Sequence, residues 1–235
     1  MSITARRVSF FVPRMLQALA WIPTRLALNF FSRFEVRGLD NVLEYPHQPI
    51  LFVANHGSEL DPIAIRAALP LFWSHAPLCY VTAPLKIFAD SVFSWRSKLY
   101  SSSWFFALWA AYPSTPNTRS YAEALKLHAS LMQEDGACFL IFPEGKRTDP
   151  TKEDPVFHGG AGYLASLEGV VTIPVSVTGF RNTTPWNFLK GRHKGMVQFG
   201  TPRDIPPSSN TAEFYQSQVA SVMEEVYEKM NIRNK

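Results

Sequence analysis

The sequence is poor in charge and in cysteine, and both shortages narrow the class of protein. Only 18% of its 235 residues are charged, below the roughly 25% typical of soluble domains, whereas 46% are hydrophobic and 14% aromatic. Such a chain is neither disordered nor a coiled coil, and its length suits one sizeable domain with a short appendage. The two cysteines, Cys79 and Cys138, are too few for a disulfide framework and fit a reducing compartment. The many aromatic side chains suggest an apolar ligand or a membrane surface.

Long apolar runs are also missing. No stretch reaches the about 18 uninterrupted apolar residues that a membrane-spanning helix needs, and the longest run covers only residues 104–112. The apolar start at 8–12 is interrupted by Pro13 and Arg14 before the core of a signal peptide develops. We therefore expect neither a spanning helix nor a cleaved signal peptide.

Acidic residues are absent from the first 34 positions. This segment holds five of the 23 basic residues, so the rest of the chain has 18 basic against 19 acidic side chains. Because the basic character is confined to one segment, we expect no nucleic-acid partner. The five basic residues are Arg6, Arg7, Arg14, Arg25 and Arg33.

Apolar residues in this segment recur at steps of three and four, with Arg7, Arg14, Gln17 and Arg25 on the other side. The prolines at positions 13 and 23 predict two short helices rather than one continuous helix. Residues 1–33 are thus a basic amphipathic appendage to a domain at 34–235. Its apolar stripe could pack on the domain's own core, but arginines without acids favour an anionic membrane surface at the cytoplasmic face. The stripe consists of Val8, Phe11, Met15, Leu19, Ile22, Leu26 and Phe30.

Beyond the appendage, continuous apolar runs at 50–54, 78–82, 137–142 and 170–177 predict strands that are buried on both faces. Helical patterns alternate with them. One spans about 120–133, with Thr118 or Ser120 as N-cap, Glu123 completing a capping box with Ser120, and Gly136 beyond its end. Another spans 211–230. This alternation predicts an α/β fold, a single domain built on a mostly parallel sheet covered by helices.

The first of these strands runs into a loop that contains His56 and Asp61. In α/β sheets the chemistry gathers at the carboxyl ends of the strands. With Pro62 suited to the first position of a helix and Asp61 to its cap, the two side chains could meet across the loop. A carboxylate beside an imidazole makes a general base with its orienting partner. The alternative is a capping Asp and a turn His that do not interact.

A second loop follows the strand at 137–142. It places Gly145 before two cations, Lys146 and Arg147, which could hold a phosphate. The guanidinium of Arg147 could bind two phosphate oxygens at once. On its own it could equally be an ordinary charged surface loop.

Signatures of other chemistries are lacking. There is no Gly-x-Ser-x-Gly turn, neither Cys adjoins a His, and no two of the six His have metal-ligand spacing. The glycine pattern at 160–165 resembles a dinucleotide fingerprint, but no predicted strand leads into it. We therefore expect no metal and no cofactor.

Taken in order, the two loops resemble the glycerolipid acyltransferase family, in particular the lysophosphatidate (1-acyl-sn-glycerol-3-phosphate) acyltransferases. That family is marked by Asn-His-x4-Asp, then Phe-Pro-Glu-Gly followed by basic and hydroxyl residues, then a Val-Ile-Pro-Val strand. The matching residues are Asn55, His56 and Asp61, then 142–148 and 171–175, with a further similar segment at 157–162. The resemblance covers about residues 34–200.

The resemblance implies direct transfer of a fatty acyl group from a thioester of coenzyme A or acyl carrier protein to the hydroxyl of a lysophospholipid, most simply lysophosphatidate. His56 would remove the hydroxyl proton and Asp61 would hold His56. The glycerol and phosphate of the acceptor would be seated by Phe142, Pro143, Glu144, Gly145, Lys146 and Arg147.

One segment departs from the family pattern. Members with a phosphate-bearing acceptor usually carry a Pro-Val-Asp-Arg-like segment between the two motifs, but the Asp and Arg positions are occupied here by Thr115 and Pro116. Arg119, at the start of the predicted helix, is a candidate replacement. Otherwise the enzyme remodels another lysophospholipid or acylates an amino-acid lipid. A membrane-lipid-binding protein without activity is the non-enzyme alternative, and the presence of both His56 and Asp61 argues against it.

A basic loop at 181–194 is the candidate contact for the phosphates of the donor. It includes Arg181, Lys190, Arg192, His193 and Lys194. A solvated surface loop explains the same residues equally well.

Overall fold

The apolar runs of the sequence form the centre of one sheet. A computed structural model describes residues 9–84, 102–116, 118–150, 154–181, 183, 188–190, 194–205 and 211–230. Within them, seven strands lie in the order β1-β7-β6-β2-β5-β3-β4. Their bounds are β1 Glu35–Arg37, β2 Ile50–Ala54, β3 Cys79–Thr82, β4 Ala111–Pro113, β5 Phe139–Ile141, β6 Val171–Thr178 and β7 Met196–Phe199.

Pairing in this sheet is parallel except between β6 and β7. β2 lies at the centre, with Val53 opposite Ile141 of β5 and Pro174 of β6. The carboxyl ends of β2, β5 and β6 therefore meet at one edge. The predicted mostly parallel α/β sheet is confirmed, with the four predicted strands shifted by at most two residues at either end.

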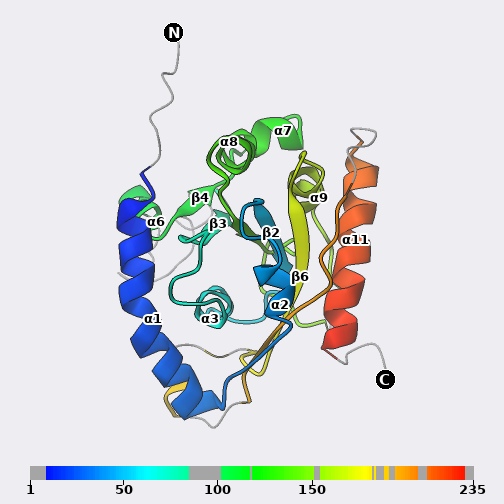
Figure 1. The fold of residues 1–235 in the computed structure, drawn as a ribbon. Helices are drawn as coiled ribbons and strands as arrows, with labels where there is room; N and C mark the ends of the chain where they lie inside the picture. Colours follow the sequence, from blue (N-terminus) through cyan, green and yellow to red (C-terminus); the bar gives the residue numbers. More distant parts are fainter. Residues whose placement is uncertain are drawn as a thin grey trace.

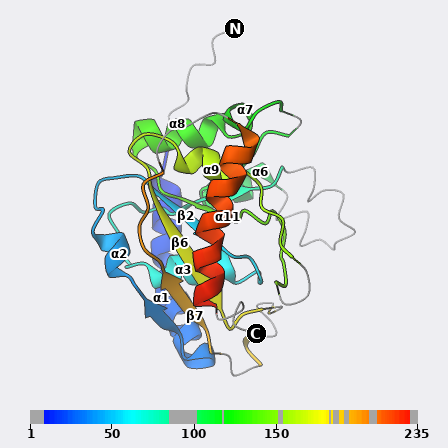
Figure 2. The same ribbon diagram turned by 90° about the vertical axis from the view of Figure 1, so that its right-hand side faces the viewer.

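Helices cover both faces of the sheet (Figure 1). α1 (Phe11–Ser32) and α3 (Asp61–Ala68) lie on one face, where Ile50 and Phe52 of β2 point. Leu51 and Val53 point to the other face, toward α8 (Lys126–Asp135), α9 (Gly160–Ala165) and α11 (Ala212–Lys229). Figure 2 shows α11 crossing in front of the sheet, on the side opposite α1. The remaining described helices are α2 (Asp40–Leu43), α6 (Ser103–Leu108) and α7 (Tyr121–Ala124).

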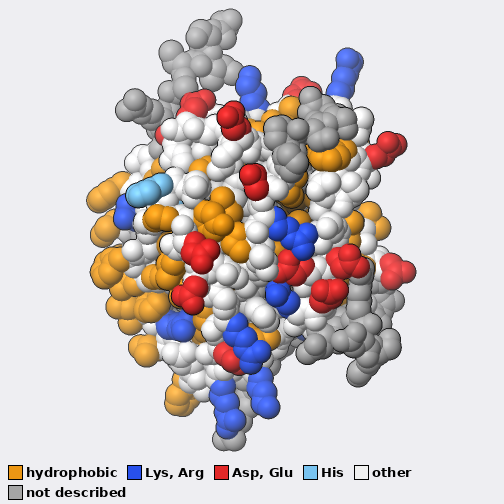
Figure 3. All heavy atoms as spheres, turned by 45° about the vertical axis from the view of Figure 1, so that its right-hand side comes forward, with side chains coloured by type: hydrophobic (Ala, Val, Ile, Leu, Met, Phe, Trp, Pro, Cys, Tyr) orange, Lys and Arg blue, Asp and Glu red, His pale blue; other side chains and the backbone are white. Residues whose placement is uncertain are grey.

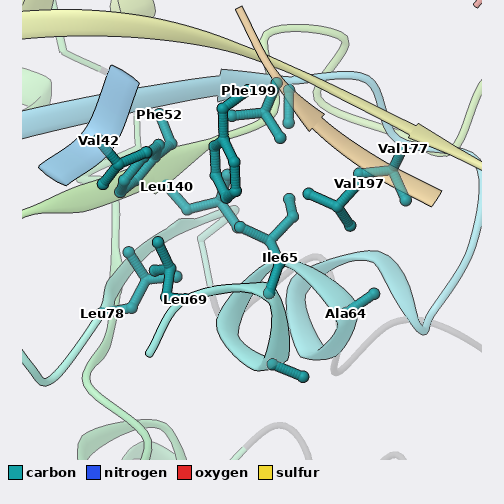
Figure 4. Packing of buried hydrophobic residues seen from close by; sticks show 14 of the residues in the cluster. Val42, Phe52, Ala64, Ile65, Leu69, Leu78, Leu140, Val177, Val197 and Phe199 are labelled. Atoms are coloured by element: carbon teal, nitrogen blue, oxygen red, sulfur yellow. The ribbon is translucent and has the colours of Figure 1, made fainter. Parts of the chain in front are cut away.

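The core beneath α3 is built from large aliphatic and aromatic side chains. Ile65 of α3 points at the sheet and lies among Phe52, Leu140 and Phe199 (Figure 4). All four side chains are fully buried. Burial of this kind stabilises a fold by about 1.5–3 kcal/mol per side chain, so α3 is fixed firmly on the strand that ends at the predicted site.

The predicted helix at 120–133 forms as two helices, α7 and α8. They are separated at Leu125, whose ψ of 19° departs from helical geometry. Ser120 caps α7 by accepting the backbone N–H of Glu123, and Gly136 ends α8 with a left-handed φ of 65°. The Glu123 carboxylate accepts the backbone N–H of Arg119 rather than that of Ser120, so the predicted capping box is formed only in part.

The prediction of two helices in the N-terminal segment is wrong. α1 is one helix of 22 residues with Pro23 inside it. Pro13 lies in the first turn, where its missing N–H has no helical partner to lose. Pro23 is exposed, so the Leu19 carbonyl that it leaves without a helical partner lies on the outer side of α1. The lost hydrogen bond is therefore not buried, and α1 continues through Pro23 as one helix.

The apolar stripe of α1 faces away from the protein. The six stripe residues that the structure describes are 47% to 82% exposed; the seventh, Val8, lies outside the described residues, as do Arg6 and Arg7. Figure 3 shows apolar side chains crowded along the edge of the molecule where α1 lies. The interpretation that this stripe packs on the domain's own core is therefore wrong.

On its inner side α1 is attached to the domain by the buried Leu28, with Ala27 and Phe31 beside it, and by several polar groups. Gln17 is buried, and its amide both donates to the carbonyl of Leu78 at 2.8 Å and accepts the N–H of the same residue at 2.9 Å. The guanidinium of the buried Arg66 donates to the same amide oxygen at 3.0 Å. Further along α1, two more side chains donate to carbonyls at the end of α3: Trp21 to Leu69 at 2.8 Å and Arg25 to Ala67 at 3.0 Å.

Candidate active site

The loop after β2 brings the predicted pair together. Nδ1 of His56 lies 3.1 Å from Oδ2 of Asp61, so the two side chains are in contact. The Asp61 side chain is 3% exposed and the His56 ring 22% exposed. Because Nδ1 faces the carboxylate, Nε2 is the ring nitrogen directed away from it. The pair thus joins a sheltered carboxylate to a partly exposed imidazole.

Asp61 is fixed by the backbone of its own loop. The same oxygen, Oδ2, accepts the N–H groups of Gly57 at 2.8 Å and Ser58 at 2.7 Å. The expectation that Asp61 caps the helix is wrong: α3 begins at Asp61, and Leu60 holds the cap position without a side-chain bond. The carboxylate turns back onto the preceding loop because the N–H groups there need an acceptor.

Asn55 fixes the end of β2. Its side-chain amide donates to the carbonyl of Val177 at 2.9 Å and accepts the N–H of the same residue at 2.8 Å. Ala54 pairs with Val175 in the preceding step of the ladder. The Asn55 side chain therefore extends the pairing of β2 with β6 by one step and holds the start of the His56 loop.

The second predicted loop makes three contacts with His56. The Phe142 ring stacks on the imidazole with centroids 4.2 Å apart and an interplanar angle of 19°. The Thr148 N–H donates to the carbonyl of His56 at 2.8 Å. Oε1 of Glu144 accepts the N–H of His56 at 3.3 Å. Gly145 turns the loop at a left-handed φ of 66°, where a Cβ would come 2.9 Å from the His158 ring.

Glu144 is buried behind this loop. Its Oε1 also accepts the hydroxyl of Tyr227, from α11, at 2.9 Å. Burial raises the pKa of the Glu144 carboxyl, and hydrogen bonds from Thr148, Tyr227 and His56 act in the opposite direction. The sequence places Glu144 among the residues that seat the acceptor, whereas the structure shows its carboxylate bound to protein groups beneath His56.

The two cations of the loop lie on the surface. Arg147 donates to Oε1 of Glu59 at 3.0 Å, and both side chains are about half exposed. Because Glu59 belongs to the His56 loop, this contact places Arg147 at the rim of the site. Lys146 is exposed as well.

Arg119 follows β4 at the same edge of the sheet, but β5 and β3 separate β4 from β2. No contact among the described residues joins Arg119 to the loops that carry His56 and Arg147. Of the predicted donor-binding loop, Arg181 pairs with Asp149, while Arg192 and His193 lie outside the described residues.

Neither cysteine suits a nucleophilic role. Both are buried free thiols: Cys79 begins β3, and Cys138 directly precedes the neighbouring β5. Burial raises the pKa of Cys138 to about 12 and that of Cys79 further. Thiols in this state are inert at neutral pH.

The described residues contain no group of three or more His, Cys, Asp or Glu side chains placed to hold a metal ion. None of their helices is long and apolar enough to cross a membrane.

A model of the family described as Acyltransferase matches residues 33–178, which is more than half of the chain and includes both loops. The chain therefore belongs to the acyltransferase family. The segments that carry the earlier resemblance all fall within this match.

Two curated relatives point to a more particular group. The chain is 26% identical over 180 residues to a 1-acyl-sn-glycerol-3-phosphate acyltransferase of Chlamydomonas reinhardtii, covering 77% of this chain and 49% of that protein. It is 30% identical over 134 residues to a probable 1-acyl-sn-glycerol-3-phosphate acyltransferase of Mycoplasma genitalium, covering 57% and 46%. The chain spans about half the length of these relatives.

The fold also matches a solved structure. The crystal structure of PlsC, the 1-acyl-sn-glycerophosphate (LPA) acyltransferase from Thermotoga maritima, superposes with a TM-score of 0.59 over 94% of this chain and 79% of that one, at 21% identity. At this identity the likeness shows the fold alone.

Proposed function

We propose that this protein transfers a fatty acyl group from a thioester to the free hydroxyl of a lysophospholipid, with lysophosphatidate as acceptor and phosphatidate as product. The observation that carries the proposal is the contact between His56 and the buried Asp61 in a chain of the acyltransferase family. The names of the two curated relatives support the choice of acceptor.

In this mechanism His56 is the general base. Asp61 accepts a hydrogen bond from the Nδ1–H group, so the lone pair of Nε2 is available to take the proton of the acceptor hydroxyl. The hydroxyl oxygen attacks the thioester carbonyl, forming the new C–O bond, and the C–S bond then breaks. The imidazolium, stabilised by Asp61, returns its proton to the leaving thiolate. The donor is acyl-CoA or an acyl carrier protein thioester, and no further cofactor takes part.

The acceptor phosphate binds at the rim in this proposal. Arg147 and Lys146 are exposed cations on the loop that packs against His56. A guanidinium can give two parallel hydrogen bonds to a phosphate, which a water-exposed pair with Glu59 does not prevent. Arg119, three strands away from β2 in the sheet, is a secondary candidate for this role.

We further propose that α1 lies on an anionic bilayer at the cytoplasmic face. Its apolar stripe is exposed on the side away from the domain, whereas the attached side combines polar contacts such as that of Gln17 with the buried Leu28, so the stripe is a second apolar surface that is available to lipid. Arg14 and Arg33 are exposed and can meet lipid phosphates. Arg25 is held by the Ala67 carbonyl and the Phe34 ring, so it is not one of the lipid contacts.

A second acceptor class remains a candidate because Thr115 and Pro116 replace the acidic and basic residues of the usual motif. It would be a zwitterionic lysophospholipid in remodelling, or an amino-acid lipid. The deciding experiment supplies the purified full chain with each acceptor in turn, with acyl-CoA and with acyl carrier protein thioester. Preference for lysophosphatidate supports the proposal, and preference for a zwitterionic acceptor supports remodelling. Absence of transfer with every pair would leave a lipid-binding protein.

A further inference from the structure

A tyrosine of the C-terminal helix reaches the back of the candidate site. Tyr227 lies near the end of α11, outside the segment that matches the family model. Its side chain is buried, with the ring against Phe157 at 6.1 Å between centroids. Its hydroxyl donates to Oε1 of Glu144 at 2.9 Å. A hydroxyl inside the core thus meets the carboxylate that lies beneath His56.

One carboxylate oxygen connects the two sides. Oε1 of Glu144 accepts both the Tyr227 hydroxyl and the backbone N–H of His56. Glu144 is 3% exposed, so water does not readily replace either donor. The position of the Glu144 carboxylate, and with it the start of the His56 loop, therefore depends on a residue more than eighty positions further along the chain.

We propose that Tyr227 is a positioning residue for acyl transfer, because its hydroxyl holds Glu144 and Glu144 holds the backbone of His56. This inference rests on the proposed function, in which His56 is the general base. Tyr227 does not touch the substrates. It acts by keeping the imidazole where Asp61 and Phe142 orient it, since small displacements of a base lower the rate of proton transfer steeply.

The charge of Glu144 gives the proposal a second consequence. The groups that face this carboxylate are His56 from the loop after β2, Thr148 from its own loop and Tyr227 from α11, while Lys146 and Arg147 are exposed. Burial already raises the pKa of Glu144, and the Tyr227 hydroxyl lowers it. Removing that hydroxyl raises the pKa further, so Glu144 is protonated up to a higher pH. A neutral Glu144 binds the His56 N–H less strongly and no longer stabilises the imidazolium.

The test is Tyr227→Phe, which removes one oxygen and keeps the ring. We expect kcat to fall about tenfold, in line with the loss of a hydrogen bond to a charged group, while KM for either substrate changes less than about twofold. The acidic limb of the pH profile of kcat should move to higher pH. A merely structural residue would leave that limb unchanged.

Two further variants separate a positioning role of Tyr227 from a contribution to the stability of the fold. Val222→Ala on the same helix removes a buried side chain with no polar link to the site, and should lower the melting temperature while kcat and the pH profile stay as in wild type. In Glu144→Gln, which itself lowers kcat, adding Tyr227→Phe should lower it little further, because the tyrosine acts through the carboxylate. The comparison of Glu144→Gln with the double variant remains informative even if Tyr227→Phe alone lowers the melting temperature.

The outcomes distinguish the two proposals. If His56→Ala abolishes transfer and Tyr227→Phe keeps the wild-type kcat and pH profile, the positioning role is wrong and the proposed function stands. If Val222→Ala reproduces the kinetic changes of Tyr227→Phe, the effect is one of stability and the inference also fails. If His56→Ala retains activity, the general-base mechanism fails first.

Discussion

Phe142 stacks on the imidazole of His56, with the two ring centroids 4.2 Å apart. The stacking joins the two loops that the sequence motifs define, since His56 follows β2 and Phe142 follows β5. At the ring edge, Nδ1 of His56 faces Asp61. The ring is therefore held by an apolar contact on one face and by a carboxylate at Nδ1, which directs Nε2 away from Asp61 and favours the tautomer that carries the proton on Nδ1.

The first prediction concerns this ring. His56→Ala should lower kcat by about 100- to 10,000-fold, because the acceptor hydroxyl loses its base. Asp61→Asn should also be severe, since an amide can present the wrong partner to Nδ1. The measurement is the steady-state rate of the folded variants, with His47→Ala, an exposed histidine on another loop, as the control. Retention of more than about a tenth of the wild-type rate in His56→Ala contradicts the assignment.

The second prediction concerns the acceptor. Arg147→Ala should raise the KM for lysophosphatidate roughly ten- to hundredfold and leave the KM for the donor almost unchanged, because a hydrogen bond between charged groups is lost on one substrate only. Arg37→Ala is a matched control: Arg37 also forms an exposed pair with a glutamate, Glu35, but on the edge strand β1. Equal effects of Arg147→Ala on both substrates would remove the proposed role.

Contacts close in sequence were predictable. The central strand, the Ser120 cap and the glycine that ends α8 follow from local patterns, and so does the approach of His56 to Asp61 across five residues. In each case the partners are brought together by one turn or one loop, so the residue types and their spacing carry the necessary information.

Contacts between distant elements were not predictable in this way. The bond from Tyr227 to Glu144 depends on how α11 lies on the sheet, which no local pattern specifies. The continuity of α1 was missed for a related reason. The rule that proline interrupts a helix holds where the lost hydrogen bond would be buried, and only the tertiary structure shows that Pro23 is on the outer side.

The third prediction concerns the attachment of α1. Gln17→Ala should destabilise the protein by about 1–3 kcal/mol, because the peptide groups of Leu78 and the buried guanidinium of Arg66 lose their partner. Chemical unfolding measures the loss. Gln133→Ala, at an exposed position of α8, is the control and should change stability little. A Gln17→Ala variant as stable as wild type would show that water or a rearranged side chain replaces the amide.

The fourth prediction concerns the outer face of α1. Leu19→Ser combined with Leu26→Ser should lower partition onto anionic vesicles about a hundredfold or more, since each leucine that enters the apolar layer contributes about 1.5–3 kcal/mol. Both side chains are exposed, so the fold should be unaffected. Activity on acceptor presented in a bilayer should fall, whereas activity on a monomeric short-chain acceptor should stay near that of wild type. Vesicle sedimentation and the two assays measure these effects.

Salt separates the apolar contribution from the charge contribution to membrane binding. Arg14→Gln should weaken vesicle binding at low ionic strength and have little effect at high salt, because attraction between an exposed arginine and anionic lipid is screened within a Debye length. The double leucine variant should bind weakly at both salt concentrations. Asn29→Ser, another exposed position of α1, should bind as wild type does. If the double leucine variant sediments with vesicles as the unchanged chain does, the membrane contact lies elsewhere, and the exposed Trp104 of α6 is the next position to change.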